Sequence, residues 1–94
     1  MHVTMRYYTN AAALGDAMAA KTDEVHDLIS TVPGFIAYYS IRKGDIITSI
    51  TVCQDKAGTD ETTKRAGVWV KENVKGGVTP PMINEGDTFI SFTK

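Results

Sequence analysis

Two apolar runs on either side of a short turn dominate the hydrophobic pattern of the chain. Residues 33–53, PGFIAYYSIRKGDIITSITVC, contain two stretches rich in β-branched and aromatic residues, separated by Lys43-Gly44-Asp45. This composition around a tight Gly/Asp turn predicts a β-hairpin. If the loop holds an even number of residues, the odd positions of the first strand lie beside the even positions of the second.

The two faces of this hairpin differ in polarity. One face is almost wholly apolar and consists of Phe35, Ala37, Tyr39, Ile41, Ile46, Thr48, Ile50 and Val52. The other face is mixed and consists of Ile36, Tyr38, Ser40, Arg42, Ile47, Ser49, Thr51 and Cys53. We expect the apolar face to receive the helices of the fold and the mixed face to meet a partner and any ligand.

The N-terminal third of the chain predicts a strand followed by a helix. Residues 2–9 alternate an apolar set, Val3, Met5 and Tyr7, with a polar-aromatic set, His2, Thr4, Arg6 and Tyr8. Asn10 is a suitable helix N-cap. From Ala11 to Val32 the apolar residues lie on one helical stripe, and Pro33-Gly34 ends the helix.

The C-terminal half predicts a second helix and a last strand. Asp55 can cap this helix, although Gly58 leaves a later start possible, and Trp69 lies on its apolar stripe. Gly76-Gly77 stops the helix, and Thr79-Pro80-Pro81 forms a short rigid link. Residues 82–93 read as a strand with a bulge at 85–87.

The expected order of elements is therefore β-α-β-β-α-β. With right-handed crossovers this order gives a ferredoxin-like α+β sandwich, in which a four-stranded antiparallel sheet carries both helices on one face. The uncovered face would present Ile36, Tyr38 and Ile47. A second copy of the chain, related by a two-fold axis, is the simplest cover for so apolar a face.

Composition narrows the class of protein further. The 94 residues are expected to form one domain, 1–94, with a formal net charge of -1 and no charged block, which argues against nucleic acid or a membrane surface as partner. No apolar run approaches the ~20 residues of a membrane span, and the N-terminus lacks the apolar core of a signal peptide. Cys53 is the only cysteine, which fits a reducing compartment. We therefore expect a cytoplasmic protein.

Several segments of the chain resemble the dimeric α+β barrel superfamily, and within it the antibiotic biosynthesis monooxygenase (ABM)-like domains. The resemblance is carried by RYYT at the end of the first strand, VPGFIAYY at the junction of helix and second strand, VCQDKAG, AGVWVKENV and a final strand after the two prolines. It implies a homodimer. It also implies either cofactor-independent oxidation of polycyclic aromatic phenols or degradation of haem. The haem-degrading members use an Asn on the first strand, a Trp in the second helix and a His after it. Here Asn10 lies at the end of its strand and no His follows Trp69, so haem degradation is not expected.

The candidate pocket residues come from the mixed face and its neighbours. They are Arg6, Tyr8, Tyr38, Ser40, Ser49, Thr51 and Asn84, expected inside the barrel between two copies, with Trp69 as a core residue or a wall of a pocket between helix and sheet. Tyrosine hydroxyls and an Arg could orient a phenol and stabilise its anion. The same groups could instead be ordinary interface residues that bond one another. Neither His has a second ligand at metal spacing, so no metal is expected.

Two functions remain open at this stage. One is a cofactor-free monooxygenase-like enzyme acting on a small aromatic or phenolic substrate, with no cofactor and no identified catalytic residue. The other is a non-catalytic dimer that binds a small apolar ligand or serves as an interaction module. A hollow barrel lined by the tyrosines would favour the enzyme, whereas a barrel filled by its own side chains would favour the module.

Overall fold

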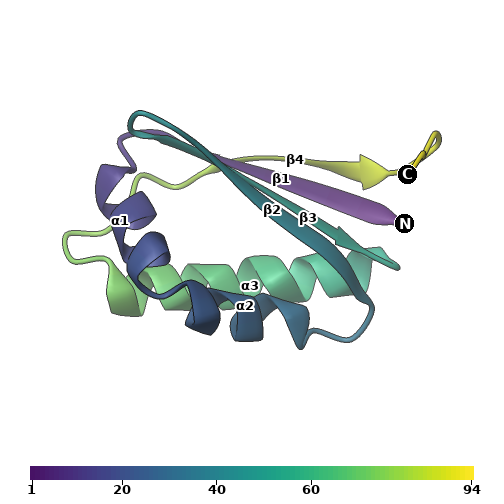
Figure 1. Ribbon diagram of the computed structural model, residues 1–94, viewed down its shortest axis with the longest axis horizontal. Coiled ribbons are helices and arrows are strands. Elements are labelled where there is room, and N and C mark those ends of the chain that lie inside the picture. The colour runs from purple at the N-terminus through teal and green to yellow at the C-terminus, as the bar shows by residue number, and fades with distance from the viewer.

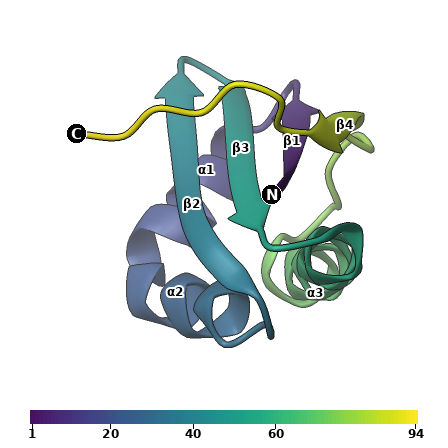
Figure 2. The same ribbon diagram turned by 90° about the vertical axis from the view of Figure 1, so that its right-hand side faces the viewer.

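The protein, described over all 94 residues by a computed structural model, consists of one sheet with its helices on one side (Figures 1 and 2). In chain order the elements are β1 (His2–Tyr8), α1 (Ala12–Ala20), α2 (Thr22–Ser30), β2 (Phe35–Lys43), β3 (Ile46–Cys53), α3 (Lys56–Asn73) and β4 (Met82–Asp87). The sheet order is β2-β3-β1-β4, and every neighbouring pair is antiparallel. The ferredoxin-like α+β sandwich predicted from the sequence is confirmed.

The hairpin of β2 and β3 has the expected register. A two-residue connection, Gly44 and Asp45, places Tyr39 opposite Ile50 and Ile41 opposite Thr48. Gly44 has a φ of 61°, a conformation that glycine adopts without steric cost. The turn chemistry of the sequence therefore fixed which side chains share a face from Ala37 onward. A register shift between Phe35 and Ala37 places Phe35 opposite Cys53, so the face predicted for Phe35 was wrong.

Which face the helices cover is the opposite of what we expected. The helix side of β3 carries Ile47, Ser49, Thr51 and Cys53, and that of β1 carries His2, Thr4, Arg6 and Tyr8; all eight are buried. The more apolar face is open, where Tyr39 is 62% exposed and Ile41 is 55% exposed.

The chain connections, rather than hydrophobicity, select the covered face. Right-handed crossovers place the helices on one side of the sheet whatever side chains point there. Gly58 shows how closely α3 then approaches β3, because a Cβ at this position would lie 2.8 Å from the Cβ of Cys53. The prediction that the most apolar face of the hairpin receives the chain's own helices was therefore wrong.

The long helix predicted over residues 11–32 is two helices. They meet at Lys21, whose φ of -128° and ψ of 40° are not helical. The hydroxyl of Thr22 donates to the carbonyls of Met18 and Ala19 at 3.3 and 3.2 Å, and the amide of Lys21 also donates to Met18 at 3.2 Å. Asn10 is not the N-cap: it has a φ of 50°, and Ala11 holds the cap position without a side-chain bond.

The second half of the chain follows the prediction as far as Asp87. Asp55 caps α3 by accepting from the amide of Gly58 at 3.1 Å. The last strand, however, ends at Asp87 and contains no bulge, because its register with β1 is regular from Met82 to Asp87. Beyond Asp87, Thr88 donates to the carbonyl of Met1, which precedes β1, through its amide at 2.9 Å and its hydroxyl at 3.2 Å. Residues 88–94 pass above the sheet away from the helices (Figure 2), with Phe89 93% and Phe92 90% exposed.

The core lies between the sheet and the helices and is small. Its buried members are Tyr8, Ala11, Leu14, Ile47, Trp69 and Val74. None of the helices combines the length and the apolar composition needed to cross a bilayer. The polar part of the covered face, described next, accounts for the modest size of this core.

Candidate functional site

A small pocket lies between the helix-facing side of the sheet and all three helices. Twelve residues line it, ten of them hydrophobic: Arg6, Tyr8, Leu14, Met18, Val25, Leu28, Ile29, Tyr38, Ser49, Ala66, Trp69 and Val70. Its free volume is about 30 Å³. We call it the inner pocket.

Five of the eight predicted site residues meet in the inner pocket: Arg6, Tyr8, Tyr38, Ser49 and Trp69. They surround a space within one chain, so the expected location between two copies was wrong. The reversal of the sheet faces is the cause, because the mixed face of the hairpin points at the chain's own helices.

The other three candidates lie outside the inner pocket. Ser40 is exposed and lines a neighbouring groove, and Thr51 is fully buried one row along the sheet. Asn84 pairs with Met5 across β1 and β4 and therefore shares the open face of the sheet. Asn84 is thus separated from the pocket by the sheet itself.

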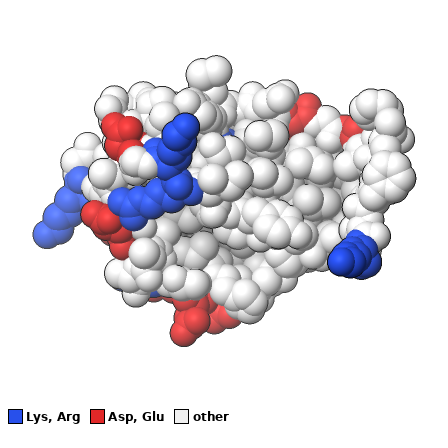
Figure 3. Space-filling view, turned by 45° about the horizontal axis from the view of Figure 1, so that its top comes forward, with Lys and Arg blue, Asp and Glu red and all other residues white.

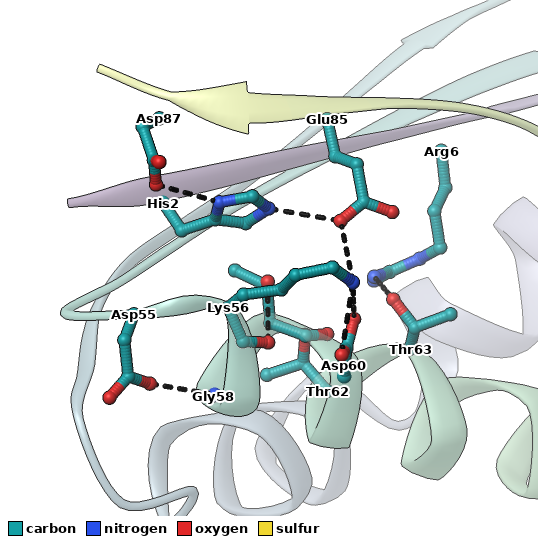
Figure 4. A network of polar contacts seen from close by, with 11 residues as sticks. His2, Arg6, Asp55, Lys56, Gly58, Asp60, Thr62, Thr63, Glu85 and Asp87 are labelled. Carbon is teal, nitrogen blue, oxygen red and sulfur yellow. Dashed lines mark hydrogen bonds and ion pairs between the residues drawn. The ribbon is translucent and has the colours of Figure 1, made fainter. Parts of the chain in front are cut away.

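Arg6 is a buried cation without an anionic partner. Its side chain is among the fully buried ones, with 1% of the residue exposed. Its Nη1 donates to Thr63 Oγ1 at 3.3 Å, its Nε has no partner, and none of the ion pairs in the chain includes it (Figure 4). Burying an unpaired charge costs several kcal/mol, so such a group usually marks the place of a missing anion. The geometry therefore favours a ligand with negative charge.

Tyr8 lies beside Arg6 and keeps its proton. Burial raises the pKa of the Tyr8 hydroxyl, and the positive charge of Arg6 offsets this rise only in part. A neutral phenol next to a cation can donate a hydrogen bond to an anionic ligand. The pair therefore offers a charge and a proton donor at one point of the pocket.

Side-chain hydroxyl groups form the remaining polar part of the inner pocket and its surroundings. The hydroxyl oxygens of Tyr38 and Ser49 lie 3.1 Å apart, and the hydroxyl oxygen of Ser40 lies 3.4 Å from that of Ser49. The hydroxyls of Thr4 and Thr51, which pair across β1 and β3, are buried without a partner. Such unpaired groups are rare in interiors and cluster where water or a ligand completes the bonding.

Trp69 closes the pocket from the side of α3 and is held at both ends. Its indole Nε1 donates to Glu24 Oε1 at 2.9 Å, and its backbone carbonyl accepts from Asn73 at 2.9 Å. Trp69 thus belongs both to the core cluster and to the pocket wall, which were the two roles considered for it. Sequence reasoning missed Glu24 and Thr63; the helical spacing of Thr59, Thr62 and Thr63 with Ala66 was a usable signal for the latter.

Two open grooves adjoin the inner pocket. The first, about 270 Å³, lies between α3, β1 and the link before β4, and shares Arg6, Tyr8 and Val70 with the pocket. The second, about 250 Å³, lies between β2 and the junction of α1 and α2, and shares Met18, Val25 and Tyr38. We call them the β1–α3 groove and the β2–α1 groove.

A separate polar cluster ties the end of the sheet to α3 (Figure 4). His2 is buried, with Nδ1 3.0 Å from Asp87 Oδ1 and Nε2 2.9 Å from Glu85 Oε1. Lys56 contacts Glu85 at 3.3 Å and Asp60 at 2.8 Å. His2 therefore points to the helix side of the sheet and is fixed there by two carboxylates. No group of His, Cys, Asp and Glu in the chain is arranged to hold a metal ion.

Solved structures share the ferredoxin-like α+β fold of this chain, and several of them carry the name antibiotic biosynthesis monooxygenase.

The monooxygenase from the gene ActVA-Orf6 of Streptomyces coelicolor, in complex with nanaomycin D, aligns with a TM-score of 0.71 at 14% identity, over 99% of this chain and 91% of that one. The protein NE2512 of unknown function from Nitrosomonas europaea aligns with a TM-score of 0.73 at 17% identity, over 99% and 93%. A variant of MhuD with two manganese protoporphyrin IX molecules per active site aligns with a TM-score of 0.72 at 10% identity, over the whole of both chains.

These identities establish a shared fold. No family model matches the chain, and no curated protein matches its sequence. The inner pocket does not suit a porphyrin: it is about 30 Å³ in volume and no His or Cys lines it.

Proposed function

We propose that the protein is a cofactor-independent, monooxygenase-like enzyme that oxidises a small phenolic or other acidic aromatic compound. The observation that carries the proposal is the unpaired, buried Arg6 beside the protonated Tyr8 at the edge of an open groove. The resemblance to ABM-like structures, one of which is named a monooxygenase, supports the reaction class.

The residues of the chain can supply what such a reaction needs. A phenol that loses a proton becomes an electron-rich anion, and Arg6 stabilises that anion in a site of low dielectric. Tyr8 orients the ring and moves protons, while Tyr38 and Trp69 line the adjoining inner pocket, where Trp69 excludes water. The balanced reaction converts a ring CH₂ and O₂ into a carbonyl and water, so it needs no external reductant.

Substrate access from the β1–α3 groove fits the sizes involved. The groove, about 270 Å³, is large enough for a small fused-ring compound such as an anthrone-type phenol, whereas the inner pocket, about 30 Å³, is not. A ring in this groove would contact Arg6 and Tyr8 from the side of β4. Gly67 leaves open space there, since a Cβ at its position would contact nothing within 4 Å.

The test is oxidation of an anthrone-type phenol in air, followed by absorbance of the quinone. We expect wild-type protein to form quinone above the uncatalysed rate and Arg6→Met to lose at least tenfold in kcat/KM. Lys64→Met, which changes an exposed cation on α3, is the matched control and should stay within twofold. Wild-type protein that forms no quinone above background would reject the proposal.

A second candidate function is a non-catalytic dimer that binds a small apolar ligand. Two observations favour it: the inner pocket is nearly filled by side chains, and no strongly coupled acid–base pair lines it. Binding of the phenol detected through Trp69 fluorescence, without turnover, would favour this function.

The open face of the sheet supports the homodimer that both functions assume. It is broad and largely free of charge in the space-filling view (Figure 3). Four exposed aromatic side chains contribute to the apolar surface: Tyr7 and Tyr39 on the sheet, and Phe89 and Phe92 after β4. At roughly 200 Å² for a fully exposed aromatic side chain, they expose on the order of 550 Å² together. With Met5, Ile41, Met82 and Ile90 also exposed, the apolar area reaches the ~800 Å² per partner of a stable interface.

A further inference from the structure

The inner pocket has an unusual combination of size and lining. About 30 Å³ is room for one or two molecules the size of water, whereas a cavity that admits a benzene ring measures about 150 Å³. On the helix side it is lined by apolar side chains such as Leu14, Val25 and Ala66. On the sheet side it is lined by Arg6 and by the hydroxyl-bearing residues Tyr8, Tyr38 and Ser49. A space this small admits a diatomic molecule and excludes an aromatic ring.

We propose that the inner pocket is a dioxygen site, separate from the β1–α3 groove in which the substrate ring binds. This inference rests on the proposed function, because it assigns a place to the second reactant. Dioxygen is apolar and partitions from water into apolar surroundings, so the walls of the pocket favour it. Arg6 and Tyr8 line both spaces and therefore lie where the two reactants would meet.

The charge of Arg6 gives this arrangement a chemical role. The substrate anion transfers one electron to O₂, which gives a substrate radical and superoxide, and the two combine into a carbon-bound peroxide. The peroxide takes up one proton and loses water as the remaining C–H bond breaks, which leaves the carbonyl. Negative charge thus passes from the substrate to oxygen beside a guanidinium that has no other anion.

Tyr8 is placed to supply the proton that the peroxide takes up. Its hydroxyl is kept neutral by burial and lies at the same boundary between pocket and groove. The proton that leaves the substrate carbon in the first step goes to water in the open groove. Water in the same groove returns a proton to Tyr8 after Tyr8 has donated its own to the peroxide. Protons and electrons therefore balance with O₂ as the sole oxidant.

The decisive experiment fills the pocket without touching the groove. Ala66 lines the inner pocket and neither groove, so Ala66→Leu should occupy the space. Ala20→Leu, at an exposed position of α1 that lines none of these spaces, is the matched control. If Ala66→Leu does not fold, Val25→Ile adds a single methyl group to the same wall.

Crystals pressurised with xenon report occupancy without any need for activity. We expect xenon in the inner pocket of wild type and Ala20→Leu and not of Ala66→Leu. We also expect the KM for O₂ to rise at least fivefold in Ala66→Leu while the KM for the phenol stays within twofold. An inner pocket without xenon, or an unchanged KM for O₂, overturns the dioxygen site even where quinone is formed. Absence of quinone from wild type instead rejects the proposed function, which xenon occupancy does not test.

Discussion

Replacement of Arg6 by Met is expected to stabilise the fold while it removes the anion site. Arg6 is 1% exposed and makes a single 3.3 Å hydrogen bond, to Thr63. An unpaired buried ion costs several kcal/mol, and one charged hydrogen bond returns about 1.5 kcal/mol. Met has a similar length, no charge, and the flexibility to fill the space. The free energy of unfolding should therefore rise by about 1–3 kcal/mol.

The measurement is urea unfolding at fixed protein concentration, followed by the fluorescence of Trp69, the only tryptophan. For a chain of this size, 1 kcal/mol corresponds to ~4–8 °C in Tm, so the increase is large enough to see by calorimetry as well. Arg65→Met is the control. Arg65 bonds Leu28 O at 3.0 Å and Thr31 Oγ1 at 2.9 Å, so its loss should destabilise by about 1 kcal/mol.

The opposite outcome has a clear meaning. If Arg6→Met is less stable than wild type by 1 kcal/mol or more, the guanidinium is compensated in the native state and has a structural role. The inference of a missing anion would then fail. A more stable Arg6→Met that has lost activity is the pattern expected of a functional group held at a cost to stability.

Three further predictions concern the rest of the molecule. Hydrogen bonds to Asp87 and Glu85 raise the pKa of His2, so the stabilisation from these contacts is complete below the ordinary pKa of 6.5 and is lost as pH rises through the higher pKa of the folded state. The difference in unfolding free energy between wild type and His2→Gln should therefore shrink from pH 6 to pH 9 in urea unfolding. A difference that grows over this range would contradict the prediction. For the proposed homodimer, Tyr39→Asp should give a monomer in sedimentation at micromolar concentration, whereas Glu72→Ala should leave a dimer, because only the former puts a carboxylate on the open face. Gly58→Ala should lower the free energy of unfolding by about 1–3 kcal/mol, because the new Cβ would lie 2.8 Å from the Cβ of Cys53. Gly67→Ala, whose Cβ would meet no atom within 4 Å, should raise it by up to about 1 kcal/mol. Equal shifts in Tm for the two variants would refute the packing argument.

Local chemistry made several features predictable from the sequence. The Gly44-Asp45 turn set the register of the hairpin from Ala37 onward, so the side chains that share a face in that part were known in advance. The Asp55 cap set the start of α3. Arg6, Tyr8, Tyr38 and Ser49 were recognised as one group because strand alternation makes face-sharing a local property.

The break at Lys21 and the end of β4 could not be predicted in this way. A continuous apolar stripe is compatible with one helix or with two helices that pack on the same core. The choice depends on the packing of both segments against the sheet and α3, which the pattern of apolar positions does not specify. Likewise residues 88–93 have the composition of a strand, but the pairing of β4 with β1 ends at Asp87, opposite His2.

The sequence by itself determined the order of the strands, the sheet and the membership of each face apart from Phe35. Only the tertiary structure decided that the polar face lies under the helices and the apolar face lies open. The physical reason is that crossover handedness and chain connections place the helices, while hydrophobicity states only that a face needs cover and not which molecule supplies it. That decision moved the candidate site from the space between two copies to a pocket within one chain, at Arg6.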